Sequence, residues 1–288
     1  MKKSKEILSP ESLNDLEFKD FKSVSGVFFH LVFRRYALVT SLFGVFVIVL
    51  ALFLFAVVEF VIFNIFAIFS SILIYAGIFA AIAERWFMGN FAKTIGFKYE
   101  GSAPLSTVSG KIFEIGSSRS ITNVISGEYK GHPFRLFHYK YVQRIDGRRD
   151  KTFPFTVMEI TFEDIRFPHM ALRSRRMPKF FRSGKDELEI SLEDEFRSHF
   201  QLFCKDNYQI EALQIFNTDT LTLLRDTASD FSIEFADNKV YIYDNIHIRN
   251  KKDLHELYEV SEKIFDSIGP LIIRLSGHFD VMHKYFRS

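Results

Sequence analysis

Residues 57 to 64 read VVEFVIFN and lie in the middle of an apolar stretch that runs from Tyr36 to Ala83. Glu59 is the only charged residue among these 48. One helix of this length would extend roughly 72 Å at 1.5 Å per residue, whereas the hydrocarbon core of a bilayer is about 30 Å thick. The stretch is therefore too long for one membrane crossing, but each half has about the 20 residues that a crossing needs.

We therefore predict a hairpin of two transmembrane helices, at about residues 37–58 and 62–83, with its turn at Glu59 and Asn64. A carboxylate at the bilayer centre costs at least about 2.5–3.5 kcal/mol, so the interface is the favourable place for Glu59. The alternative is that Glu59 lies within the membrane as a proton or ion relay. A secretory signal fits poorly, because the apolar run is too long and follows a polar leader with several acidic residues.

Basic residues that flank the apolar stretch set the expected orientation, because Lys and Arg resist translocation across the membrane. Arg34 and Arg35 precede the first segment, and Arg85 follows the second segment beside Trp86, the single tryptophan. We expect these four side chains to anchor the hairpin at the interface, with burial in the following domain as the alternative for Trp86. The predicted location is the plasma (inner) membrane, with two spans and both termini in the cytoplasm.

The predicted fold is a membrane-anchored α+β protein, in which a transmembrane hairpin precedes a soluble region with an antiparallel β-meander and helices. The predicted segments are a cytosolic amphipathic lead-in (1–35), the transmembrane hairpin (36–83), a juxtamembrane helix and linker (84–110), an antiparallel β-rich unit (111–170), a basic loop (171–187), and an α+β unit with a C-terminal helix (188–288). Whether the two soluble units share one core is left open by the sequence.

Alternating apolar and polar residues predict strands in the soluble region. Residues 133–142 (PFRLFHYKYV) and 151–162 (KTFPFTVMEITF) flank an Asp-Gly turn, and residues 121–129 (ITNVISGEY) add a third strand. Residues 231–244 (FSIEFADNKVYIYD) predict two further strands that turn at Asp-Asn. The pattern after these strands indicates a helix that Pro270 interrupts.

Residues 200–224 read FQLFCKDNYQIEALQIFNTDTLTLL, a strand followed by Asp, a Glu-Ala pair and a leucine-rich helix. With the two N-proximal spans, the TIGFKY step after them, and Gly127 and Gly131 around a strand turn, this phrase resembles the bacterial membrane proteins of domain-of-unknown-function family 3137. The matching residues in the phrase are Asp206, Glu211, Ala212 and Leu221. The resemblance implies a membrane-anchored cytosolic module with no established activity.

Sequence motifs of common enzymes and cofactor sites are missing. The chain has no GxxxxGK[ST], GxGxxG, HExxH or GxSxG pattern, and its histidines do not form a convincing metal-ligand cluster. A single cysteine, Cys204, excludes an intramolecular disulfide and a zinc cluster built on cysteines. We therefore expect no enzyme, no cofactor and no metal, although a catalytic site assembled from distant residues stays open.

Two hypotheses for the function follow from these features, and membrane-bound catalysis ranks behind both. The favoured hypothesis is a cytosolic interaction or regulatory module, held at the membrane by the hairpin, that binds an unknown protein partner or self-associates. The second is an oligomeric transport or pore component in which polar residues of several hairpins, such as Glu59, Asn64, Ser70 and Ser71, face one another.

Residues 171–185 (ALRSRRMPKFFRSGK) form the most basic segment and contain no acidic residue. A solvated loop is the ordinary interpretation of such a segment. A domain tethered close to an anionic leaflet gives the alternative, since each basic group near that surface is worth about 1 kcal/mol. Nucleic acid is the less favoured partner, because the formal net charge is only +2. The predicted contacts to anionic lipid are Arg173, Arg175, Arg176, Lys179, Phe180, Phe181, Arg182 and Lys185.

Overall fold

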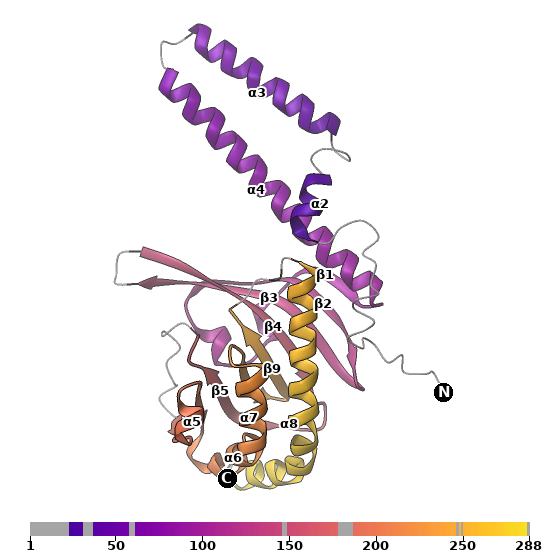
Figure 1. Cartoon of the computed structure of the whole chain (residues 1–288), viewed down its shortest axis with the longest axis vertical. Coiled ribbons are helices and arrows are strands. Elements are labelled where there is room, and N and C mark those ends of the chain that lie inside the picture. The colour runs from indigo at the N-terminus through magenta and orange to yellow at the C-terminus, as the bar shows by residue number, and fades with distance from the viewer. Residues whose placement is uncertain are drawn as a thin grey trace.

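A computed structural model describes residues 23–30, 37–57, 61–145, 149–177, 187–245, 248 and 250–286. Three helices open the described chain: α2 (Val24–His30), α3 (Ala37–Val57) and α4 (Val61–Thr94). Figure 1 shows α3 and α4 as an antiparallel pair that projects from the rest of the molecule. The rings of Phe43 and Tyr75 stack between them, with centroids 4.7 Å apart.

Both helices of this pair are long and apolar enough to cross a membrane, by length and composition. The apolar part of α3 has a mean hydropathy of 2.8 with none of it buried, and that of α4 has 2.4 with 6% buried. The prediction of two long apolar helices is confirmed. Glu59 lies outside the described residues. Asn64 was predicted in the turn, which is wrong, because α4 already begins at Val61 and Asn64 is a buried residue within it.

A nine-stranded antiparallel sheet follows the apolar helices. Its strands lie in the order β1-β2-β3-β4-β9-β8-β5-β7-β6. Their bounds are β1 (Lys98–Ala103), β2 (Ser117–Tyr129), β3 (His132–Ile145), β4 (Arg149–Thr161), β5 (Phe167–Ser174), β6 (Leu188–Ile190), β7 (Phe200–Cys204), β8 (Ser232–Asp237) and β9 (Lys239–Asp244).

The strand pairing confirms the predicted meander, which is β2-β3-β4, and the predicted hairpin of β8 and β9. Strand β1 falls in the predicted linker, so that part of the prediction is wrong. Pairing with β2 gives the backbone of β1 its hydrogen-bond partners and overrides the weak strand propensity of its residues. The two predicted soluble units are parts of one sheet, because β4 pairs with β9 from Thr156↔Asp244 to Thr161↔Lys239.

Helices in the second half of the chain are α5 (Asp194–Arg197), α6 (Gln209–Ile215), α7 (Thr218–Thr227) and α8 (Lys251–Phe286). Short 3-10 turns are η2 (Leu105–Thr107), η3 (Lys111–Glu114) and η4 (Asp206–Tyr208). Asn217 and Asn250 cap α7 and α8 by accepting hydrogen bonds from backbone N–H groups three residues later. The predicted interruption at Pro270 is wrong, because α8 continues through it. Figure 1 shows that the helix bends in its C-terminal half, as expected where a proline removes a backbone hydrogen bond.

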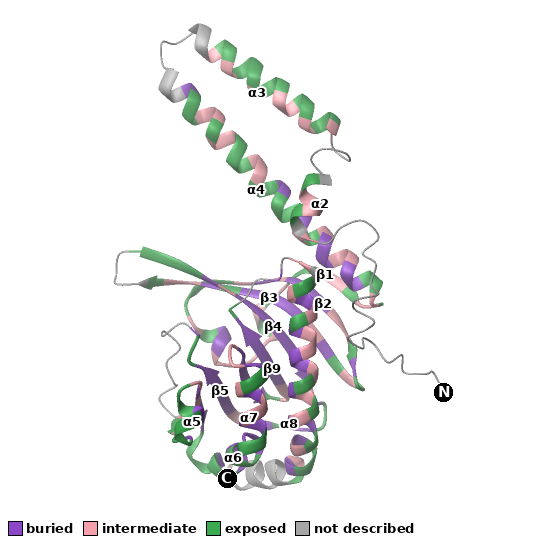
Figure 2. Ribbon diagram, in the orientation of Figure 1, coloured by how far each residue is buried: buried purple, intermediate pink, exposed green. Residues whose placement is uncertain are grey.

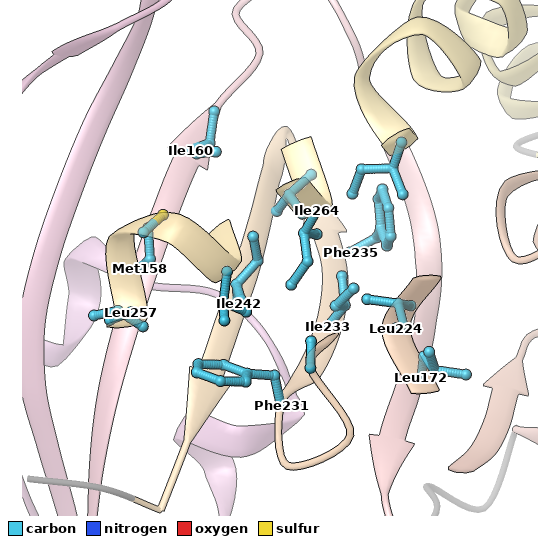
Figure 3. Close-up of a cluster of buried hydrophobic side chains, with 14 of the residues drawn as sticks. Met158, Ile160, Leu172, Leu224, Phe231, Ile233, Phe235, Ile242, Leu257 and Ile264 are labelled. Atoms are coloured by element: carbon cyan, nitrogen blue, oxygen red, sulfur yellow. The ribbon is translucent and has the colours of Figure 1, made fainter. Parts of the chain in front are cut away.

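The main hydrophobic core lies between the sheet and its helices. Figure 3 shows side chains of β4, β5, β8 and β9, such as Met158, Leu172, Ile233 and Ile242, packing with Leu257 and Ile264 of α8 and Leu224 of α7. The same cluster includes Phe87, Phe91 and Ala92 from the C-terminal third of α4. Figure 2 shows the resulting change along α4, from an exposed N-terminal part to a partly buried C-terminal part.

An aromatic cluster covers the other face of the sheet, and none of its members comes from a described α-helix. It contains Phe113, Tyr139, Tyr141, Phe155 and Tyr241, together with the buried Ile112. Phe113 lies edge-on to both Tyr139 and Tyr241, with centroids 5.0 Å apart in each pair. Since both clusters draw residues from both halves of the soluble region, the two predicted units share their cores.

Candidate functional site

Four polar side chains join α4 to the sheet at the end of the apolar stretch. Glu84, the first charged residue after the uncharged part of α4, accepts a hydrogen bond from the amide of Asn123 on β2. His138 Nδ1 on β3 lies 3.0 Å from the same carboxylate oxygen. The Tyr99 hydroxyl on β1 donates to Asn123 Oδ1 at 2.7 Å. This junction, Glu84-Asn123-His138-Tyr99, therefore connects one helix with three strands.

The backbone around Asn123 explains how the junction forms. The β2-β3 register shifts between Thr122 and Ile125, which marks a β-bulge. Asn123 has φ of 54°, in the left-handed region that Asn tolerates better than most residues. The bulge turns the amide of Asn123 toward α4. Gly89 also brings α4 close to β1, because a Cβ there would lie 3.3 Å from the Tyr99 ring.

We expect Glu84→Ala to loosen the C-terminal part of α4 from the sheet. The change leaves the buried Asn123 amide and His138 without this acceptor, which costs about 1–3 kcal/mol. Amide hydrogen exchange of residues 85–94 in nanodiscs should then accelerate by about one to two orders of magnitude. The neighbouring Arg85→Ala is the matched control, since Arg85 is exposed. Equal exchange in both variants would show that the junction does not hold the helix.

The residues predicted as interfacial anchors have different surroundings. Arg85 is exposed, whereas Trp86 packs against the main core, which is the alternative that the sequence analysis gave for it. Arg34 and Arg35 lie outside the described residues. The apolar helices are thus attached to the domain through packing and the junction.

A second group of charges lies on the aromatic face, at β5 and β8. Glu234 is fully buried and accepts hydrogen bonds from the backbone N–H groups of Lys111 and Ile112. His169 bridges two carboxylates, with Nε2 2.7 Å from Glu234 Oε1 and Nδ1 2.7 Å from Glu187 Oε1. The guanidinium of Arg173 lies 3.6 Å from Glu187 and 4.5 Å from the centre of the Phe203 ring.

Burial by itself lowers the pKa of His169, but the hydrogen bonds to Glu187 and Glu234 and their negative charges more than offset this and raise it to about 9. His169 is therefore protonated at neutral pH, and the group contains two cations and two carboxylates. Such balance is the condition under which charges remain buried. The group fastens the chain at Lys111 and Glu187 to the sheet.

A third charged group holds the segment 104–116 across the aromatic face. Arg135 and Lys239 both contact the buried Glu159, and both donate hydrogen bonds to the backbone oxygen of Thr107, at 2.9 and 2.7 Å. The Tyr241 hydroxyl accepts a hydrogen bond of 2.9 Å from the Ser109 N–H. The segment has little regular structure, so these side chains supply partners to its backbone.

The structure separates the residues that were predicted to contact anionic lipid. Arg173 is buried in the group around His169, so its assignment to an exposed basic loop is wrong. Arg175 and Arg176 are exposed, and Arg176 forms an ion pair with Asp230. Lys179, Phe180, Phe181, Arg182 and Lys185 lie outside the described residues.

A hollow of about 430 Å³ opens at the turns that follow β2 and β4. Its wall includes Glu128, His132, Glu163 and Asp164. The volume is in the range of ligand pockets. However, within the described part of the chain no group of three or more His, Cys, Asp or Glu side chains is arranged to hold a metal ion.

The sequence matches no protein-family model and no curated protein. Among solved structures, the chain is similar to the crystal structure of the mycobacterial trehalose monomycolate transport factor A, with a TM-score of 0.47 and 13% identity. The similarity covers 62% of this chain and 91% of that chain. A similarity of this size carries no argument about function.

Proposed function

We propose that this chain is an integral membrane protein whose α+β domain is a cytosolic binding module, held in a fixed orientation at the bilayer. The observation that carries the proposal is the continuity of α4. One helix runs from a part that exposes uncharged, mainly apolar side chains into a part that is buried in the core of the domain. The anchor and the module therefore share a rigid element.

The exposed side chains of α3 and α4 support membrane insertion. Leu38 is 76% exposed, Phe66 is 68% exposed and Leu52 is 64% exposed. Contiguous apolar surface of this extent is rare on soluble monomers and marks contact with lipid or protein. A bilayer covers such a surface on all sides of the pair at once.

We propose that the domain lies in the cytosol, because basic residues flank the spans and resist translocation across the membrane. The resemblance to domain-of-unknown-function family 3137 is part of this proposal. The buried charges of the domain fasten its segments to one another, which is a structural use. We therefore propose that the domain binds a partner rather than catalyses a reaction.

Extraction and thiol labelling test the anchoring and the orientation. The protein should stay in the membrane pellet after alkaline carbonate and dissolve only in detergent. Glu163→Cys places a thiol in the exposed turn after β4, while Cys204 is buried and burial raises the pKa of its thiol to about 11. A membrane-impermeant maleimide should label Glu163→Cys only after spheroplasts are lysed. The unsubstituted chain, which retains Cys204, is the control.

Three outcomes would contradict the proposal. Carbonate extraction of the full chain would show that α3 and α4 do not span the membrane. Labelling of Glu163→Cys in intact spheroplasts would place the domain outside the cytosol. Sustained turnover of a metabolite by the purified chain would replace the binding module with an enzyme, whereas a protein that copurifies in fixed ratio and crosslinks to the domain would support the module.

A further inference from the structure

Strands β3 and β4 extend beyond the rest of the sheet as a two-stranded ribbon. Pairing of β2 with β3 reaches Val142, whereas pairing of β3 with β4 continues to Ile145↔Arg149. Figure 1 shows this ribbon projecting from the side of the sheet that is nearest to α3 and α4. Beyond Val142 the ribbon has no third strand, so both of its faces are open to a contact outside the domain.

The ribbon is strongly basic. Lys140, at the base of the ribbon where β2 still pairs, and Arg144, Arg149 and Lys151 are all exposed, and Asp150 pairs with Arg144 at 3.3 Å. Four cations and one carboxylate give the described residues 140–145 and 149–152 a net charge of +3, whereas the whole chain has only +2. The projection is thus a second basic segment, apart from residues 171–185.

Contacts between α4 and the sheet fix the direction in which the ribbon points. Glu84 of α4 contacts His138 of β3, and Phe97, just beyond the end of α4, lies against Gly127, which pairs with Phe134 of β3. Toward its apolar end, α4 therefore runs in the same general direction as β3 from Phe134 to Ile145, and Figure 1 shows the ribbon leaning away from α4 to the side. At about 3.3 Å per residue, β3 extends about 20 Å from His138 to Arg144.

This geometry brings the ribbon to the level of the membrane surface. Glu84 marks the end of the uncharged part of α4 and contacts His138, so the ribbon starts near the level at which α4 leaves the bilayer and extends sideways from there. We propose that the β3-β4 ribbon binds the anionic lipid headgroups of the bilayer that α3 and α4 cross. The inference rests on the proposed membrane anchoring. It moves the lipid contact from residues 173–185, where Arg173 is buried, to a different basic segment.

A fluorescent probe tests the contact in the full chain. Thr152→Cys places an exposed thiol on the ribbon, and Glu163→Cys places one at the opposite end of β4. Each variant is labelled and inserted into nanodiscs that contain lipids with a quencher on the headgroup. With anionic lipid, quenching at position 152 should be severalfold stronger than at position 163. It should fall to the level of neutral nanodiscs in 1 M salt, where the Debye length is about 3 Å.

Charge neutralisation gives the matched comparison. Replacing Lys140, Arg144, Arg149 and Lys151 with Gln should remove the excess quenching at position 152. Replacing four exposed basic residues elsewhere with Gln should leave it unchanged. The control residues are Arg166, Lys205, Lys263 and Arg274.

The outcomes separate this inference from the proposed function. Equal quenching at positions 152 and 163 in a protein that is fully inserted would overturn the lipid contact and leave the anchoring intact. A protein that does not insert into nanodiscs and is extracted by carbonate would overturn both. If an oligonucleotide binds through the four ribbon residues while quenching stays at the neutral level, the ribbon binds nucleic acid and the lipid contact is wrong.

Discussion

Replacing His169 with glutamine is expected to destabilise the domain by about 3–5 kcal/mol. Glutamine removes the positive charge between Glu187 and Glu234, which are 3% and 0% exposed, and leaves Arg173 as the remaining cation of the group. Taking one partner from a buried ion pair is costly because the other charge has no solvent to stabilise it. The sheet should open more often at β5 and β8.

The rate at which a thiol reagent labels the single cysteine measures this opening. Cys204 on β7 pairs directly with Met170 of β5 and is fully buried, so its thiol reacts only when this part of the sheet opens. Labelling of the His169→Gln variant should be faster by about two to three orders of magnitude. His255→Gln is the control, because its pair with Glu259 is partly exposed and should contribute less than about 1 kcal/mol.

The contribution of His169 to the stability of the domain depends on pH in a defined direction. The pKa of His169 is raised from 6.5 to about 9, so its contribution to stability is complete below pH 6.5 and is lost as the pH rises through 9. The loss amounts to about 3 kcal/mol at 1.36 kcal/mol per pKa unit. The difference between the original chain and His169→Gln should therefore shrink as the pH rises from 6.5 to 9 and change little above that.

A double variant separates charge from packing. Glu187→Gln in the His169→Gln background removes one of the two carboxylates and should restore part of the lost stability. If the single variant labels Cys204 no faster than the control, or the double variant is the least stable of all, the bridge is not the source of the stability.

Local patterns in the sequence predict much of this fold. The uncharged run gives α3 and α4, and the alternation in residues 133–142 and 151–162 gives β3 and β4. These elements are determined by their own residues and by turns between neighbours. Strand β5 was not predicted, because residues 167–174 lack clear alternation and their partners β7 and β8 are distant in sequence.

The charged groups were missed for a related reason. His169 and Glu234 are 65 residues apart and meet because β5 inserts between β8 and β7 in the sheet order. Arg173 was assigned to a basic loop because its neighbours in the sequence are basic. It belongs to a strand, and the charged side chains that face it come from distant parts of the sequence. One signal was present, since Glu234 lies within the strand pattern FSIEFAD. A glutamate that belongs to a buried strand requires a partner.

A buried carboxylate at the end of β9 has the opposite effect on stability from the His169 bridge. Asp244 is 6% exposed and lines a cavity of about 40 Å³ beneath the start of α8, with Asp253 and Glu256 also in its wall. Burial raises the pKa of Asp244 to about 6. The hydrogen bond from the Asn245 N–H opposes this rise, the charges of Asp230 and Glu256 add to it, and Arg176 opposes it.

Asp244→Asn is therefore expected to stabilise the domain at pH 7.5 by about 3 kcal/mol, because burial raises the pKa of the carboxyl from its ordinary 3.8 to about 6. In the original chain, the stability linked to Asp244 is highest below pH 3.8 and is lost as the pH rises through 6, because the charged form is then buried. Asparagine keeps the acceptor for the Asn245 N–H and removes the charge.

Urea unfolding of the full chain in detergent, at pH 7.5 and pH 5, measures this effect. The midpoint of Asp244→Asn should exceed that of the original chain by more at pH 7.5 than at pH 5, since Asp244 is mainly protonated in the folded state at the lower pH. Asp164→Asn, at an exposed position, should change the free energy of unfolding by no more than about 0.5 kcal/mol at either pH. A lower midpoint for Asp244→Asn at pH 7.5 would mean that the carboxylate stabilises the start of α8, and the assignment of a buried, unfavourable charge would be wrong.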